Sequence, residues 1–408
     1  MNSNSIIRSA PLNRLKESRD LELIKVVTGI RRCGKSTLLK QYVSWLLSDQ
    51  CKVSPDQVIE INLEDPQYRD LDSWEKLYDY INDRLQLDAM NYVIVDEVQN
   101  VPEFHRAIDG LFIKDNVDSY VTGSNAYMLS SKIATVLSGR YIEVKMLPFS
   151  FAEYRQARGE VERDNKVYSD YIQNGGFPYT LNLHSEELLR DYLSGVYNTI
   201  LIKDVVNRDE IIDASVLDRI AKYIYGNIGN RLSIKKIADA LSSGSRKISP
   251  HTVDAYLNAL IDSYAVYRAK RFNLKSKEVL KTNDKYYIPD TGLRYYLFGS
   301  RIGDYGLLLE NVVYFELLRR GFDVYIGVLD EYEIDFVAQK NGELYYFQVC
   351  QTLSEETTRL RELRPLQLLR DSYPKTILTL DVAPESNTDG ILVLNAIDWL
   401  LGHRDRPI

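Results

Sequence analysis

The feature that most constrains this chain is an eight-residue loop with two glycines and a lysine, set between a predicted strand and a predicted helix. The strand covers Leu23 to Val27, the loop reads Gly29-Ile-Arg-Arg-Cys-Gly-Lys-Ser36, and apolar residues then recur at helical spacing. Glycines in such a loop let backbone N–H groups turn inward and cradle phosphate at the start of a helix. The pattern therefore predicts a phosphate-binding P-loop in an α/β fold with a parallel sheet.

Two side chains of this loop suit nucleotide chemistry. Lys35 would reach the β- and γ-phosphates, and Ser36 would give a hydroxyl oxygen to Mg²⁺. A glycine turn without a ligand is the alternative, but the strand–loop–helix context favours the P-loop. We expect the nucleotide to contact the loop and the first turn of the helix, through Gly29, Arg32, Cys33, Gly34, Lys35, Ser36 and Thr37.

A second apolar strand, residues 91–95, runs into two acids, Asp96 and Glu97. Asp96 would hold Mg²⁺ through its water shell, and Glu97 would polarise the attacking water. Solvated turn residues are the alternative reading. Together with a P-loop, the acidic pair indicates hydrolysis of a bound nucleotide.

Two further segments supply polar candidates. A third strand is followed by Ser124 and Asn125, which could sense the γ-phosphate, although a turn or a helix cap explains them equally well. Arg140 precedes the next strand, "YIEVKML". An arginine there can stabilise transition-state charge, including that of a neighbouring subunit in a homo-oligomer. A surface arginine is the alternative.

These motifs, with the blocks "YIQNGGFPYTL" (171–181), "YNTILIKDVVNRDEI" (197–211) and "GLLLENVVYFELLRRGFDVYIG", resemble a prokaryotic family of AAA+ ATPases. That family joins the ATPase to a carboxy-terminal domain of unknown function. The resemblance spans nearly the whole chain and implies ATP and Mg²⁺ as ligands, with Glu97 catalytic. We expect an ATPase domain over 1–150, a helical linker or lid over 151–215, and two further domains over 216–290 and 291–408.

The region 216–290 reads as a winged helix. Ile234 to Leu241 form an amphipathic pattern, and Ser249-Pro250 opens a second helix in the preferred cap-then-proline order. The segments "AVYRAKRF" and "KYYIPD" then read as two strands around a lysine-rich loop. Helix, turn, helix and a two-stranded wing predict a winged-helix domain.

The predicted wing is basic. Between Arg268 and Lys285 seven lysines and arginines stand against two acids, a local charge of +5. Such a surface suits contacts with DNA phosphates, with His251 and Thr252 early in the recognition helix. Protein docking and a merely solvated loop are the alternatives. The candidate DNA contacts of the wing are Lys270, Arg271, Lys275 and Lys277.

The last region contains a hairpin signal at Asn341-Gly342. If Lys340 pairs with Glu343, the register carries Asp335 opposite Gln348 and Glu333 opposite Cys350, on one face. The order of elements around this hairpin resembles the PD-(D/E)XK nuclease fold. In that resemblance the metal ligands fall at Glu310, Asp335 and Gln348.

The nuclease resemblance is incomplete. The position of the usual lysine is Cys350, and the neutral Gln348 weakens a site for a hard dication. Lys340 is roughly 16 Å along the strand from Asp335, at about 3.3 Å per residue. A lysine from elsewhere in the chain remains an open alternative. We expect a silent nuclease-like domain, with an active nuclease or an unrelated structural role as alternatives.

Composition and charge limit which other classes of protein this chain can belong to. The net charge is −7 over 408 residues, so attraction to nucleic acid would need a local basic surface. No apolar run approaches the roughly 20 residues of a membrane span, and three scattered cysteines suit the cytoplasm. The sequence favours an ATPase acting on DNA. A nucleotide-dependent switch that binds protein partners, or an ATP-dependent nuclease, remains an alternative.

Overall fold

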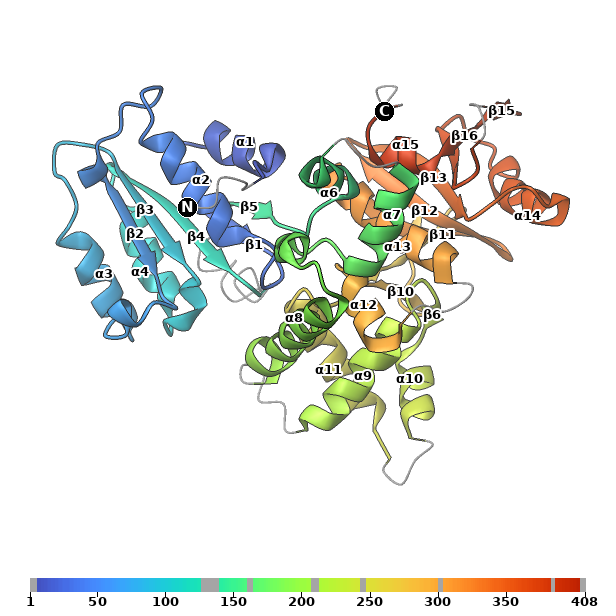
Figure 1. Cartoon of the computed structure of the whole chain (residues 1–408), viewed down its shortest axis with the longest axis horizontal. Coiled ribbons are helices and arrows are strands. Elements are labelled where there is room, and N and C mark those ends of the chain that lie inside the picture. Colours follow the sequence, from blue (N-terminus) through green and yellow to red (C-terminus); the bar gives the residue numbers. More distant parts are fainter. Residues whose placement is uncertain are drawn as a thin grey trace. The chain divides into compact units, whose positions relative to one another are not determined.

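The structure, a computed structural model, describes residues 6–125, 139–159, 164–206, 213–242, 247–299, 304–382 and 386–403 (Figure 1). The chain divides into two compact units. The first consists of Met1–Pro148 with Asp262–Tyr264, and the second of Phe149–Ile261 with Ala265–Ile408. The main segment of the first unit thus ends two residues before the expected ATPase boundary at 150.

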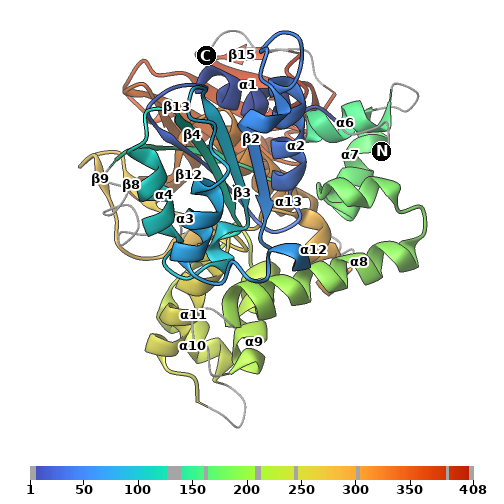
Figure 2. The same ribbon diagram turned by 90° about the vertical axis from the view of Figure 1, so that its left-hand side faces the viewer.

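Five strands of the first unit form a parallel sheet in the order β2-β3-β4-β1-β5. Figure 2 shows the molecule from the side on which this unit lies toward the viewer. The strands are β1 (Ile24–Thr28), β2 (Val58–Asn62), β3 (Asn91–Asp96), β4 (Val117–Gly123) and β5 (Tyr141–Lys145). The helices are α1 (Ser9–Glu17), α2 (Lys35–Leu46), α3 (Trp74–Asn82) and α4 (Phe104–Phe112), with 3-10 turns at Pro55–Gln57, Pro66–Tyr68 and Val98–Asn100.

The helices cover both faces of this sheet. On one face Leu77 of α3 and Ile108 of α4 pack against Val26, Ile61 and Val95 of three strands. Full burial of a side chain such as Leu77 contributes roughly 1.5–3 kcal/mol. Every residue of β1 and β3 is buried, because parallel strands are covered on both faces.

The opposite face carries buried polar side chains. Tyr42 of α2 stacks at a tilt on Tyr120 of β4, with ring centroids 4.7 Å apart. Beside them Lys25 of β1 forms an ion pair with Asp118, and both side chains are almost wholly buried. The hydroxyl of Tyr120 donates to the second oxygen of Asp118 at 2.7 Å, so this buried charge pair is satisfied by hydrogen bonds.

The strand order decides where the predicted site residues meet. β4 lies between β1 and β3, and all three run parallel. The P-loop after β1, the acids at the end of β3 and the polar residues after β4 therefore lie at one edge of the sheet. The register places Thr28 beside Gly123 and Val95 beside Val121.

The second unit begins with helices. They are α6 (Phe151–Arg158), α7 (Asp164–Asn174), α8 (Glu186–Thr199), α9 (Ala214–Gly226), α10 (Ile234–Leu241), α11 (Pro250–Asp262) and α12 (Thr291–Phe298). A 3-10 turn covers Pro178–Asn182, and α8 continues into a π-helical stretch at Ile200–Val206. As predicted, Pro250 is the first residue of its helix.

A small antiparallel sheet in the order β6-β10-β7 accompanies α9, α10 and α11. Its strands are β6 (Arg231–Leu232), β7 (Tyr267–Ala269) and β10 (Asp284–Tyr287). Between β7 and β10 the chain forms the hairpin of β8 (Arg271–Asn273) and β9 (Glu278–Val279), and β8 pairs in parallel with β11 (Asp323–Leu329). The lysine-rich segment is therefore part of the last sheet, which corrects the expectation of a free wing loop.

The last sheet has eight described strands in the order β15-β16-β14-β13-β12-β11-β8-β9. Its other strands are β12 (Tyr332–Lys340), β13 (Glu343–Cys350), β14 (Lys375–Thr379), β15 (Ser386–Thr388) and β16 (Ile391–Asn395). Its helices are α13 (Asp304–Arg319), α14 (Glu356–Gln367) and α15 (Ala396–Leu400). Apart from Asp262–Tyr264, the regions 151–215, 216–290 and 291–408 lie in one compact unit, and the boundaries expected between them stay a prediction.

The predicted hairpin is confirmed in this sheet. Lys340 pairs with Glu343, and the turn residues Asn341 and Gly342 have φ of 53° and 84°. Two left-handed residues suit the right-handed twist of the flanking strands.

No helix in the described ranges combines the length and apolar character that a membrane crossing requires.

Candidate functional site

The P-loop has the backbone conformation that its glycines permit. Gly29 has a φ of 145° and Gly34 a φ of 105°, and Gly34 caps α2. A Cβ at Gly29 would stand 2.0 Å from the carbonyl oxygen of Met146, which follows β5. Any side chain there would displace the loop from the strand ends, so glycine is required by space as well as by conformation.

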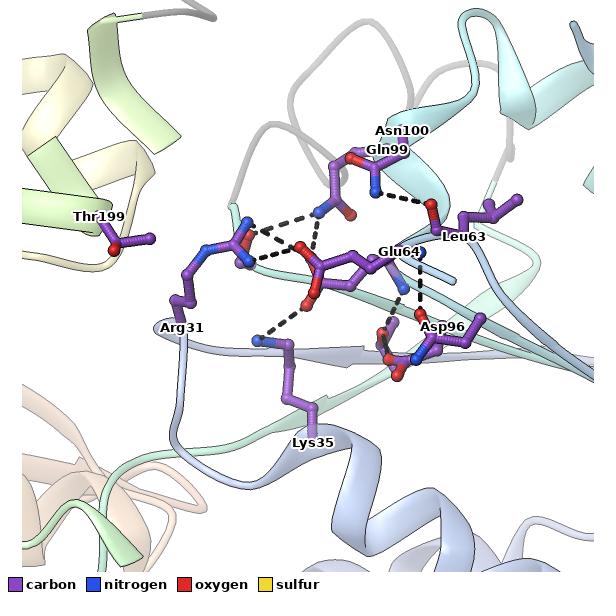
Figure 3. A network of polar contacts seen from close by, with 12 residues as sticks. Arg31, Lys35, Leu63, Glu64, Asp96, Gln99, Asn100 and Thr199 are labelled. Atoms are coloured by element: carbon purple, nitrogen blue, oxygen red, sulfur yellow. Dashed lines mark hydrogen bonds and ion pairs between the residues drawn. The ribbon is translucent and has the colours of Figure 1, made fainter. Parts of the chain in front are cut away.

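Lys35 closes the loop from inside. Its ammonium donates to the carbonyl of Gly29 at 2.9 Å and lies 3.8 Å from Oε1 of Glu97 (Figure 3). The lysine therefore points to the edge of the sheet where the acids end β3. This is the arrangement expected of a cation that neutralises phosphate charge.

The acidic pair is held by a residue that the sequence analysis missed. The hydroxyl of Thr122, near the end of β4, donates to a carboxylate oxygen of Asp96 and accepts the backbone N–H of Glu97 at 2.9 Å. Thr122 thus fixes both acids relative to the P-loop. Its position in the strand before Ser124 is the signal that could have identified it.

The side chain of Glu97 is also held by a hydrogen bond from a neighbouring residue. Its backbone is left-handed, with a φ of 57°, and the amide of Gln99 donates to its Oε2. The same amide lies 3.4 Å from the hydroxyl of Ser124. Gln99 therefore couples the carboxylate to the end of β4, and the sequence did not single it out.

Arg31 was also missed. Its guanidinium lies 2.8 Å from Oε1 of Glu64 and 3.9 Å from Oε2 of Glu97 (Figure 3). Glu64 is held near this edge because Leu63 donates its N–H to the carbonyl of Asp96 at 3.1 Å. A motif search does not find such a residue, because the position of Arg31 in a P-loop is a variable one.

The remaining residues predicted to contact the nucleotide differ in position and exposure. Ser36 and Thr37 lie in the first turn of α2, whose N–H groups are available to a ligand, and Asn125 is buried two residues after β4. The side chain of Arg32 is exposed. That of Cys33 is buried, donates weakly to the carbonyl of Met146 at 3.5 Å, and has its pKa raised by burial.

The donor set fits a nucleotide with Mg²⁺. The hydroxyl of Ser36 and the carboxylate of Asp96 are oxygen ligands of the kind that Mg²⁺ takes, usually together with waters and phosphate oxygens. The N–H groups at the start of α2 supply the favourable end of a helix dipole for phosphate.

Arg140 does not belong to this site. It precedes Tyr141, which pairs with Ile24 at the start of β1, whereas the P-loop follows the other end of β1. Five residues of strand separate the two edges by about 15 Å. Arg140 is exposed and lies 3.5 Å from Asp109. The expectation that it could act in the chain's own site is therefore corrected.

Two of the three predicted metal ligands of the last region, Glu310 and Asp335, lie beside a lysine, together with Glu333. The ammonium of Lys285, in β10, is 2.9 Å from Glu310, 2.9 Å from Glu333 and 4.0 Å from Asp335. We call these four residues the Lys285 cluster. Tyr287 adds a hydrogen bond of 2.6 Å to Glu310. A lysine from elsewhere in the chain has thus entered the carboxylate group, an alternative that the sequence left open.

These contacts correct the proposed metal site. Both ends of the Gln348 amide are used, because its nitrogen donates to Glu362 at 2.8 Å and its oxygen accepts the N–H of Asp335 at 3.2 Å. The carboxylate of Asp335 in turn accepts the N–H of Val349 at 2.8 Å. In the described ranges, His, Cys, Asp and Glu side chains form no group of three or more placed to hold a metal ion.

The Lys285 cluster is electrostatically coupled. Burial disfavours the charged lysine, but the three carboxylates outweigh it and hold the pKa of Lys285 above its ordinary value. Burial, and then repulsion from Glu310, raises the pKa of Asp335 well above its ordinary value. For Glu333 burial acts in the same sense, yet Lys285 and Arg231 lower its pKa.

The basic segment is less available than its charge suggests. Lys285 is 4% exposed and therefore belongs to the interior. Lys275 pairs with Asp330 at 2.7 Å, and Arg271 is half-buried in β8. Lys270 and Lys277 are exposed. The local charge of +5 counted from the sequence is therefore larger than the positive charge that is exposed at the surface.

Comparison with known proteins locates two family matches. A family model described as an AAA domain matches residues 22–155, which include the parallel sheet and the P-loop. A model described as a domain of unknown function matches residues 165–302, from α7 to α12. Most of the region 291–408, where the nuclease resemblance was expected, lies outside both matches.

The chain also has relatives along its whole length. An uncharacterized protein of Haemophilus influenzae is 35% identical over 405 residues, covering 98% of this chain and 100% of that protein. An uncharacterized protein of Methanocaldococcus jannaschii is 29% identical over 372 residues, covering 85% of this chain and 80% of that protein.

Among solved structures, the Walker-type ATPase paby2304 of Pyrococcus abyssi is similar, with a TM-score of 0.50 at 17% identity. The likeness covers 72% of this chain and 97% of that one. At this level of identity it shows a shared fold.

Proposed function

We propose that this chain, which contains an AAA domain over residues 22–155 and belongs to the same family as the uncharacterized protein of Haemophilus influenzae, binds ATP with Mg²⁺ and hydrolyses the bond to the γ-phosphate. The main support for this proposal is that Lys35, Asp96 and Glu97 meet at one edge of the parallel sheet. The ammonium of Lys35 lies 3.8 Å from Oε1 of Glu97. Separate segments of the sequence supply these groups, so their meeting is a property of the fold.

Each residue has a distinct task in this reaction. Backbone N–H groups of Gly34 and the start of α2 hold the phosphates, and the ammonium of Lys35 neutralises their charge. Ser36 and Asp96 would hold Mg²⁺, which would stabilise the negative charge of the phosphates. Glu97 orients a water toward the γ-phosphate, and Thr122 keeps Glu97 and Asp96 in register.

The test is steady-state ATP hydrolysis by the purified chain with Mg²⁺, repeated after chelation with EDTA. Replacement Lys35→Ala should abolish hydrolysis, because the loop then lacks its internal cation. GTP in parallel tubes tests nucleotide choice. Full activity in the Lys35→Ala protein would contradict the assignment of the P-loop as the site of ATP hydrolysis.

A second proposal concerns the helices α10 and α11 with the small sheet β6-β10-β7. Their order along the chain supports a winged helix, and Lys235 and Lys236 are exposed on α10, with Lys247 exposed just before α11. This surface is the better candidate for DNA phosphates, because the β8–β9 hairpin is tied into the last sheet.

DNA binding can be tested by fluorescence anisotropy with a labelled duplex at several salt concentrations. The double change Lys235→Glu and Lys236→Glu should weaken binding and flatten its dependence on salt. Lys76→Glu, on an exposed face of the first unit, is the matched control. If the unaltered chain binds no DNA, the switch that binds protein partners becomes the better reading of this unit.

The last region suits a nuclease-like fold without cleavage activity. This is supported by Gln348, which is neutral and has both ends of its amide engaged. Lys285, 4.0 Å from Asp335, is the observation that favours the nuclease alternative. A supercoiled plasmid incubated with the protein and Mg²⁺ or Mn²⁺ should therefore remain intact. Metal-dependent nicking that disappears in an Asp335→Ala variant would restore the nuclease alternative.

A further inference from the structure

The P-loop contains a second cation beside Lys35, directed at the same carboxylate. Oε1 of Glu97 lies 3.8 Å from the ammonium of Lys35, and its Oε2 lies 3.9 Å from the guanidinium of Arg31. The amide of Gln99 also donates to Oε2. The two cations are at ion-pair distance, so the charge of this carboxylate is balanced by Lys35 and Arg31.

Glu97 therefore occupies, with its negative charge, a place between two cations of a phosphate-binding loop. ATP brings phosphate oxygens to the same loop, where they compete with Glu97 for the cations. A guanidinium suits this exchange, because its planar N–H groups bind phosphate in pairs. Arg31 is further anchored by Glu64 at 2.8 Å, so its guanidinium is held at the site's edge.

We propose that Arg31 binds the γ-phosphate of ATP in the chain's own site, and that this contact releases Glu97 to orient the attacking water. The inference rests on the proposed function. It assigns the charge-stabilising arginine to the P-loop itself, since Arg140 lies at the opposite edge of the sheet. The neighbouring residue Arg32 has an exposed side chain and a left-handed backbone, with a φ of 68°.

The experiment combines kinetics with nucleotide binding in three variants of the full chain: Arg31→Ala, Arg31→Lys and, as a control at an exposed arginine of the first unit, Arg69→Ala. Initial rates across ATP concentrations give kcat and KM. Equilibrium titrations with fluorescent ATP and ADP analogues give the two affinities separately. Affinity for ADP also reports whether the P-loop of a variant is folded, because ADP lacks the γ-phosphate.

We expect Arg31→Ala to lower kcat by roughly 100-fold or more, as for other residues that contact developing phosphate charge. It should weaken binding of the ATP analogue by about tenfold and leave ADP affinity within about twofold, because only ATP offers the γ-phosphate. Arg31→Lys should recover part of the loss, since lysine provides charge without the paired N–H groups. Arg69→Ala should match the unaltered chain.

Equal loss of ATP and ADP affinity in Arg31→Ala would overturn the inference, because it would indicate a structural role. A kcat within twofold of the unaltered chain would overturn it as well, while leaving the proposed function intact. If the unaltered chain binds neither nucleotide, the proposed function fails, and the inference fails with it.

Discussion

The ammonium of Lys285 lies 2.9 Å from a carboxylate oxygen of Glu310, and this ion pair joins the small sheet β6-β10-β7 to the helix α13. Glu333 of β12 lies at the same distance from the ammonium. One buried cation thus connects segments that the sequence assigns to two domains.

Replacing Lys285 by Met should destabilise the second unit by about 3–5 kcal/mol, because three carboxylates would lose their buried counter-charge. Unfolding in urea, followed by the fluorescence of Trp399 with Trp45 and Trp74 replaced by Phe, measures this loss. Lys281→Met, at an exposed position, is the control and should change stability by no more than about 0.5 kcal/mol. Coinciding urea midpoints for the two variants would contradict the role of the Lys285 cluster.

Asp290 predicts a pH dependence of the second unit. This buried carboxyl caps α12 and accepts the N–H of Gly176 at 2.7 Å, yet burial outweighs such hydrogen bonds and raises its pKa to about 7. An unfolded aspartate has a pKa of about 3.9. The folded state therefore binds a proton that the unfolded state releases, and stability falls as pH rises from about 4 to 7, by at most about 1.4 kcal/mol per pH unit.

Melting temperatures between pH 5 and 8 test this slope. Asp290→Asn should be less stable throughout, because its amide replaces one acceptor, but its profile should be flatter below pH 7. Parallel profiles for the two proteins would show that Asp290 does not titrate in this range.

Thr122 should matter for turnover more than for nucleotide affinity. Thr122→Val removes the hydroxyl that joins Asp96 and Glu97, and supporting residues of this kind cost about 10–100-fold when lost. Thr122→Ser keeps the hydroxyl and should retain most of the rate. The test is to measure kcat for both variants. An equal loss of kcat in both would indicate that altered packing, and not the lost hydroxyl, slows turnover.

Arg140 should affect hydrolysis only if neighbouring chains assemble. Its position at the far edge of the sheet excludes a contact with its own P-loop. Arg140→Ala should therefore leave the rate per chain unchanged at concentrations where the protein is monomeric by light scattering. A loss of rate in the monomer would contradict the placement of Arg140.

The local motifs of the fold could be predicted from the sequence because they depend on short spacing. The P-loop at Gly29–Ser36 and the hairpin at Asn341-Gly342 each specify their own backbone through glycine and turn residues. The meeting of Lys35 with Glu97 followed from the rule that parallel strands end at one edge.

The remaining features depend on contacts between distant segments. Lys285 and Glu333 are 48 positions apart in the sequence, and only the folded sheet brings them together. The hairpin β8–β9 looked like a wing because its partner strand, β11, lies some 50 residues further on. Arg31 was overlooked because its position in the loop carries no motif requirement.

The most direct test of the central claim compares the unaltered chain with a Glu97→Gln variant in the same MgATP solution. The measurement is phosphate release per chain, with the affinity for a fluorescent ATP analogue determined in parallel. The site as described predicts hydrolysis by the unaltered chain, and a rate at least about 100-fold lower in the variant with ATP affinity within a few-fold. Equal phosphate release by both proteins, or none by the unaltered chain, would contradict the assignment of Glu97 and of the ATPase site.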